Sequence, residues 1–85
     1  MEIHYSKIFL KNYHRLPQKV KTKFESLETI FRQNPFNPKL KTHPLLGNLR
    51  GYYSFSIDYH YRVVFDFISE NEIWFHNIGT HQVYQ

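Results

Sequence analysis

Cysteine is absent from this sequence of 85 residues. The chain can therefore form neither a disulfide framework nor a zinc site with thiolate ligands, and a reducing cytoplasm suits it. Long hydrophobic runs are also lacking: none approaches the length of a membrane span, and residues 1–5 contain no apolar core of a signal peptide. There is no internal repeat, linker or low-complexity tract. We therefore expect one cytoplasmic domain, residues 1–85, without a membrane association.

Acidic residues are scarce in the first part of the chain. Residues 1–50 contain ten Lys or Arg and three Glu, a net charge of +7, whereas residues 51–85 contain one Arg and four Asp or Glu, a net charge of −3. A strongly basic half on a small domain indicates a polyanion or an acidic protein as partner. A solvated, lysine-rich helix surface would explain the same asymmetry almost as well.

Aromatic residues are abundant, with eight Phe, seven Tyr and one Trp, and apolar side chains recur at helical spacing in residues 7–33. Ser6 is a suitable N-cap for a first helix over residues 7–14. Pro17 suits the first position of a second helix, from Gln18 to about Gln33. Residues 3–5 form a candidate strand that could join a sheet edge. The side chains expected to face the core are Phe9, Leu10, Tyr13, Val20, Phe24, Leu27, Ile30 and Phe31.

Three later segments, residues 52–58, 61–68 and 73–78, alternate in polarity or are rich in β-branched and aromatic residues, which predicts strands. Short polar turns separate them, so we expect an antiparallel meander. The basic segment before it, residues 39–51, is expected to be irregular. The predicted fold is α+β: an N-terminal strand, a two-helix hairpin and a three-stranded meander, with the helices packed on one sheet face.

Arg62 is the unusual residue of the expected central strand. Alternation places it on the sheet face opposite the apolar side chains of Tyr61 and Val63. A semi-buried arginine is unfavourable unless it meets an anion. A salt bridge to Asp58 or Asp66 is the simpler explanation and is favoured for a lone arginine on a strand. A bound phosphate is the functional alternative.

Five short motifs follow one another along almost the whole chain. They are Ile3-x-Tyr5-Ser6, Asn34-Pro35-Phe36, residues 43–52 (HPLLGNLRGY), residues 61–65 (YRVVF), and Ile78-Gly79-Thr80-His81-x-x-Tyr84. Each motif is weak alone, but all five in this order form a specific pattern. In this pattern the sequence resembles the RelE/ParE superfamily of bacterial toxins, nearest to the mRNA interferases of its YoeB/YafQ-like branch.

The resemblance implies the toxin of a type II toxin–antitoxin pair. Such a protein is an endoribonuclease that cleaves mRNA, usually in the A site of the ribosome, and a cognate acidic antitoxin neutralises it. His43 matches a histidine of the YafQ-like group, and Arg62 matches the strand arginine of the YoeB-like group. His81 and Tyr84 match the histidine and the C-terminal aromatic residue of both groups. His60 stands where YafQ-like enzymes carry an acidic catalytic residue.

The residues fit this chemistry. RNA cleavage without a metal needs a base that activates the 2′-hydroxyl, a cation that stabilises the phosphorane and an acid that protonates the 5′-oxygen. We expect His43 to act as the base, Arg62 to bind the phosphate and His81 to act as the acid, with Tyr84 stacking on or orienting a nucleotide. The expected RNA-binding residues are Lys39, Lys41, Arg50 and His60.

No cofactor or metal is expected, because the six histidines match no compact zinc spacing. We assign His4, His14 and His76 to the surface or to packing. Two departures from the family pattern stand out: Ser56 occupies a position where relatives carry Arg or His, and no carboxylate replaces the YoeB-like glutamate base. Two alternatives therefore stay open, a ParE-like inhibitor of DNA gyrase and a catalytically inactive relative that only binds an antitoxin.

Overall fold

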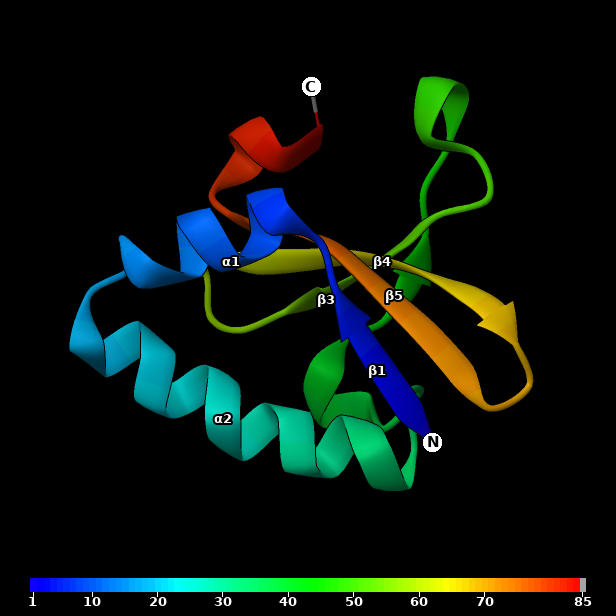
Figure 1. Cartoon of the computed structure of the whole chain (residues 1–85), viewed down its shortest axis with the longest axis horizontal. Helices are drawn as coiled ribbons and strands as arrows, with labels where there is room; N and C mark the ends of the chain where they lie inside the picture. The colour runs from blue at the N-terminus through cyan, green and yellow to red at the C-terminus, as the bar shows by residue number, and fades with distance from the viewer. Residues whose placement is uncertain (85) are drawn as a thin grey trace.

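The computed structural model describes residues 1–84, in which two helices pack against one face of a five-stranded sheet (Figure 1). The sheet order is β1-β5-β4-β3-β2, with β1 parallel to β5 and the other pairs antiparallel. The predicted α+β class is therefore confirmed. The elements are β1 (Glu2–Tyr5), α1 (Lys7–His14), α2 (Gln18–Gln33), η1 (Pro38–Leu40), β2 (His43–Pro44), η2 (Gly47–Leu49), β3 (Tyr53–Ser56), β4 (Arg62–Ser69), β5 (Glu72–Gly79) and η3 (His81–Tyr84), where η marks a 3₁₀ helix.

The helices begin and end where the local sequence predicts. The Ser6 hydroxyl accepts a hydrogen bond from the Phe9 N–H at 2.9 Å and so caps α1. Pro17 precedes α2 as its N-cap residue. One expectation is wrong: Leu10 is 46% exposed, because this short helix turns only its Phe9 and Tyr13 side toward α2.

The core between the helices and the sheet is aromatic. Phe31 of α2 is fully buried, and its ring centroid lies 5.0 to 5.2 Å from those of three sheet residues, Phe55, Phe65 and Phe75. Edge-to-face and tilted contacts of this kind add to the free energy gained by burial alone. These contacts fix α2 on one face of β3, β4 and β5.

The segment between α2 and β3 is more ordered than the sequence indicates. Leu40 of η1 is fully buried and anchors it, and the two residues of β2 extend the sheet, with His43 opposite Ser54 and Pro44 opposite Tyr53. A two-residue strand is too short to show a periodicity. Its proline is tolerated because β2 is an edge strand.

The sheet face opposite α2 is termed the open face here. Two 3₁₀ segments lie on this face: η3, in red at the upper left of the view, and η2, in green at the upper right (Figure 1). Alternation along β4 puts Arg62, Val64 and Asp66 on the open face. Within residues 1–84, neither helix is long and apolar enough to cross a membrane.

Candidate active site

Arg62 lies at the beginning of β4, and the expected salt bridge is not formed. The Asp58 carboxylate accepts hydrogen bonds from the backbone N–H groups of His60 and Tyr61, both at 2.8 Å. The Asp66 carboxylate instead pairs with His76, at 2.8 Å. Both carboxylates are engaged elsewhere, so among residues 1–84 no salt bridge neutralises Arg62.

Neutral groups hold the Arg62 guanidinium in place. One terminal nitrogen donates to the Tyr59 carbonyl at 3.1 Å and the other to the Tyr84 hydroxyl at 3.4 Å, and the guanidinium lies 5.7 Å from the centre of the Tyr84 ring. Its Nε is buried and has no hydrogen-bond partner in the described part of the chain. A positioned cation without a counter-ion is suited to bind an anion.

The β3–β4 turn that holds Arg62 depends on Asp58. Burial alone would raise the pKa of the Asp58 carboxyl, but the N–H groups of Tyr61 and His60, together with the charge of Lys23, outweigh burial and keep this pKa below its ordinary value. The ionised carboxylate therefore stabilises the turn and, through it, the Tyr59 carbonyl that Arg62 contacts.

Residues 81–84 fold back over the open face as the 3₁₀ helix η3, which is the bent arrangement expected from the sequence. Gly79 precedes it, and a Cβ at this position would lie only 3.1 Å from Val83 Cγ1. The Tyr84 hydroxyl is hydrogen-bonded to the Ser54 hydroxyl at 2.7 Å, and the His81 and Tyr84 ring centroids are 5.5 Å apart. The turn thus gathers Arg62, His81 and Tyr84 over the first part of β4.

His43 of β2 lies on the same face of the sheet. It lies directly opposite Ser54 in the ladder, so its side chain emerges on the same sheet face as the Ser54–Tyr84 contact. The His43 Nδ1 is 3.0 Å from the Lys41 carbonyl oxygen. Because a carbonyl only accepts, Nδ1 donates this hydrogen bond, and Nε2 makes no hydrogen bond to residues 1–84. Lys41 itself adopts a left-handed backbone conformation, with φ of 53°.

A surface cavity of about 720 Å³ adjoins Arg62 and His81. We term it the basic cavity, because its charged lining is mostly cationic. It includes the predicted RNA-binding residues Lys39, Lys41 and His60, and also Lys23 of α2. Sequence reasoning missed Lys23, since nothing in the helix pattern distinguishes it from Lys19 or Lys21. Lys23 lines the cavity because η1 and the β3–β4 turn pack beside this part of α2.

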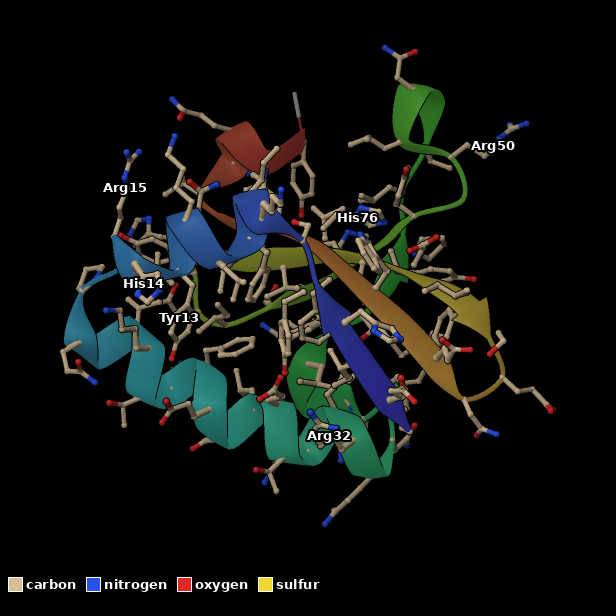
Figure 2. All side chains as sticks on the ribbon, viewed as in Figure 1. Tyr13, His14, Arg15, Arg32, Arg50 and His76 are labelled. Carbon is tan, nitrogen blue, oxygen red and sulfur yellow. The ribbon has the colours of Figure 1, made fainter. Side chains whose placement is uncertain are left out.

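Arg50 is not part of this group. It lies exposed at the C-terminal end of η2, and its side chain points away from the sheet (Figure 2). The basic segment 39–51 therefore divides: Lys39 and Lys41 line the basic cavity, while Arg50 points away from it. Its position therefore does not support the prediction that Arg50 binds RNA together with Lys39 and Lys41.

A different group of side chains has ligand atoms close enough to hold a metal ion. Ligand atoms of Glu2, His4 and Glu72 lie within 4.8 Å of one another where β1 pairs with β5, and all three are partly or largely exposed. None of the predicted catalytic residues belongs to this group. The predicted catalytic residues supply a cation, two imidazoles and a phenol.

The chain is similar to solved bacterial toxins. YafQ from E. coli strain BL21(DE3) superposes with a TM-score of 0.80 at 23% identity, over 98% of this chain and 96% of that one. A YoeB/ParE toxin from Agrobacterium tumefaciens gives 0.81 at 22% identity, over 95% and 99%. YoeB in its complex with YefM from Staphylococcus aureus gives 0.77 at 25% identity, over 95% and 97%.

Neither the scan of protein-family models nor the search of curated proteins finds a match. The structural similarity nevertheless extends over nearly the whole of both chains in each pair. The chain therefore has the fold of the YafQ and YoeB toxins, and its resemblance to the YoeB/YafQ-like branch of the RelE/ParE toxin superfamily is confirmed.

Proposed function

We propose that the protein is the toxin of a toxin–antitoxin pair and acts as an endoribonuclease on mRNA. The observation that carries this proposal is the Arg62 guanidinium, which the Tyr59 carbonyl and the Tyr84 hydroxyl hold with no neutralising carboxylate among residues 1–84. His81 lines the same cavity as Arg62, and His43 lies on the same sheet face, opposite Ser54. A cation and two imidazoles are the groups that can serve as phosphate clamp, acid and base in RNA cleavage without a metal.

The proposed reaction is a transesterification. His43 Nε2 takes the proton of a ribose 2′-hydroxyl, and the 2′-oxygen forms a bond to the adjacent phosphorus. Arg62 stabilises the negative charge that develops on the phosphorane oxygens. The bond from phosphorus to the 5′-oxygen breaks, His81 donates the proton to that oxygen, and a 2′,3′-cyclic phosphate remains.

Tyr84 would position the RNA rather than transfer a proton. Its hydroxyl is engaged by Ser54 and Arg62, so its ring is the part that is offered to a nucleotide. The basic cavity beside Arg62 would receive neighbouring phosphates through Lys23, Lys39 and Lys41.

The proposed protein partner is an acidic antitoxin. The similar YoeB from S. aureus and YafQ from E. coli are both solved in toxin–antitoxin complexes. The basic first half of this chain would attract an acidic segment, so binding should weaken as the salt concentration rises. Titration calorimetry with the antitoxin of the same operon, at about 50 and about 500 mM salt, measures this dependence. Equal affinity at both concentrations would contradict an electrostatic contribution.

The proposed activity is tested by mapping mRNA ends by primer extension in a translation extract. Arg62→Ala and His81→Ala should each slow cleavage by roughly 10²- to 10⁴-fold, because they remove the cation and the acid. Arg15→Ala and His14→Ala are the matched controls, since both residues are exposed at the end of α1 (Figure 2), and they should cleave like the parent.

Two results would contradict the proposal. One is cleavage by His81→Ala as fast as by the parent protein. The other is DNA gyrase inhibition by a parent protein that cuts no RNA. Thermal unfolding of each variant separates a loss of chemistry from a loss of fold. If Arg62→Ala unfolds the domain, Arg62→Lys tests the same point, because it retains the charge but not the two-pronged geometry.

A further inference from the structure

A histidine and an aspartate form a polar pair on the open face, four residues along β4 from Arg62. His76 Nε2 and Asp66 Oδ1 are 2.8 Å apart, and each side chain is 32% exposed. The pairing depends on an irregularity in the ladder: Val64 opposes Asn77 while Phe65 opposes Phe75, which leaves His76 as the extra residue. Such a bulge redirects a side chain, here toward Asp66. The sequence alone had assigned His76 to packing or the surface.

The pair has unused hydrogen-bonding capacity. Among residues 1–84, the His76–Asp66 bond is the only hydrogen bond that either side chain makes. Because an ionised carboxylate only accepts, His76 Nε2 donates the hydrogen bond to Asp66. The second oxygen of Asp66 accepts no hydrogen bond from residues 1–84 and is left as an acceptor on a partly exposed surface.

Aromatic rings surround this pair. The Tyr52 ring meets the His76 ring edge-on, with centroids 4.8 Å apart, and the Trp74 ring centroid is 6.0 Å from that of His76. Tyr52 and Trp74 are each only half-buried. Half-exposed rings on a sheet face, next to polar groups, are the means by which proteins stack unpaired RNA bases.

The location fits a nucleotide next to the cleaved bond. Asp66 follows Arg62 by four residues on the same face of β4, a distance of about 13 Å along the strand. The Ser54–Tyr84 contact lies between them, since Ser54 opposes Val64. An RNA strand whose phosphate meets Arg62 would therefore bring a neighbouring base over the Asp66–His76 pair.

The charges near Arg62 and near Asp66 favour a base, rather than a phosphate, at this pair. The basic cavity adjoins Arg62, whereas Asp66 is followed across the sheet by the Glu72 and Glu2 carboxylates around His4. These carboxylates would repel a phosphate. A neutral base that offers N–H groups would instead be attracted.

We propose that Asp66, His76, Tyr52 and Trp74 form a nucleobase-binding subsite that decides which RNA sequence the protein cuts. The preferred base carries an exocyclic amino group, because the unused oxygen of the Asp66 carboxylate, which His76 holds in place, pairs with an amino N–H donor. Uracil has no amino group and is disfavoured. Tyr52 and Trp74 hold the base by stacking. The assignment of the subsite to cleavage specificity rests on the proposed ribonuclease function.

The first test compares cleavage maps of one long mRNA. Asp66→Asn keeps the shape but replaces an acceptor by an amide, and it should change the relative rates at different cut sites by roughly 5- to 150-fold. Glu70→Gln is the control, because it makes the same change of charge at an exposed turn residue between β4 and β5, and it should preserve the map. An equal change at every site with Asp66→Asn indicates a purely structural role and overturns the subsite.

The second test does not depend on cleavage. Short RNA oligonucleotides with 2′-O-methyl groups cannot form the cyclic product, so their binding can be followed by fluorescence anisotropy. The parent should bind oligonucleotides containing cytosine, guanine or adenine at the varied position more tightly than the uracil version, and Tyr52→Leu should weaken all of them. Identical affinities of the parent for all four overturn the subsite.

The two tests separate the proposals. If the parent cuts no RNA, the ribonuclease function fails, and the binding measurements still decide whether the subsite exists. If Asp66→Asn does not fold, Asp66→Glu serves in its place, because it keeps the charge and displaces the carboxylate by one methylene. It should reduce the discrimination between bases, and unchanged discrimination contradicts the proposal.

Discussion

At the scale of single residues, the contact between Ser54 and Tyr84 links the open face to η3. Ser54 is 1% exposed, and Tyr84 supplies the hydrogen-bond partner of its hydroxyl at 2.7 Å. A buried hydroxyl that loses its partner is unfavourable by about 1–3 kcal/mol, whereas removing both partners can be nearly neutral. The free-energy contribution of the contact can therefore be measured by comparing single and double variants.

We therefore expect Tyr84→Phe to lower the free energy of unfolding by about 1–3 kcal/mol. Adding Ser54→Ala to it should restore part of this loss, because the orphaned hydroxyl is then gone. Chemical denaturation of both single variants and the double variant gives the coupling free energy. Strictly additive effects would mean that the contact contributes nothing.

In the cleavage assay, Tyr84→Phe should retain more activity than Tyr84→Ala, since the ring remains.

At the scale of elements, Tyr5 joins β1 to α2. The Tyr5 hydroxyl donates a hydrogen bond to the Glu28 carboxylate. The Arg32 guanidinium donates to the Tyr5 hydroxyl oxygen at 3.5 Å. Burial, followed by the hydrogen bond and the charge of Glu28, raises the pKa of Tyr5 to about 12, although Arg32 acts in the opposite direction. The folded protein therefore holds this proton more tightly than the unfolded chain, whose tyrosine has the ordinary value of 10.0.

The sign of the resulting pH dependence follows from linkage. The stabilising effect of Tyr5 is complete below pH 10 and is lost as the pH rises from 10 toward 12, because only the unfolded chain releases the proton there. The parent should thus lose stability more steeply than Tyr5→Phe over this range. Urea denaturation at several pH values measures the difference between the two proteins. Parallel curves would show that this hydroxyl does not titrate differently in the folded state.

At the scale of the whole molecule, the excess of positive charge in the first half becomes localised in the fold. Lys23 of α2 and Lys39 and Lys41 around η1 are distant in sequence but line one cavity next to Arg62. Affinity for single-stranded RNA falls with salt, with a slope of about −0.7 on a double-logarithmic plot for each phosphate neutralised. The cavity lysines should therefore set the salt dependence of RNA binding.

Lys23→Gln should reduce the steepness of this plot by about 0.7, because one phosphate contact is lost. Lys21→Gln is the control: it lies on the same helix, but its ammonium sits 5.7 Å from the Tyr13 ring centre rather than in the cavity. Its slope should equal that of the parent. Binding of a 2′-O-methyl oligonucleotide between about 50 and about 500 mM salt gives the slopes. Equal losses in both variants would indicate a diffuse charge effect.

The sequence by itself determined most of the local structure. Apolar spacing predicted both helices, and alternation and composition predicted the three strands of the meander and the face on which Arg62 lies, because these periods follow from backbone geometry within one segment. The sequence also singled out Arg62, His81 and Tyr84, which lie together in the fold. The bent tail was a local prediction as well, since a turn was needed to bring His81 and Tyr84 to one side.

Only the tertiary structure decided which distant groups meet. The sequence favoured a salt bridge of Arg62 with Asp58 or Asp66. In the fold, however, the turn amides bind Asp58 and a bulge in β5 brings His76 to Asp66. Strand register and packing likewise decide that β2 pairs with β3, that Lys23 lines the basic cavity and that Arg50 does not. Such choices are made between segments, so no pattern within a single segment records them.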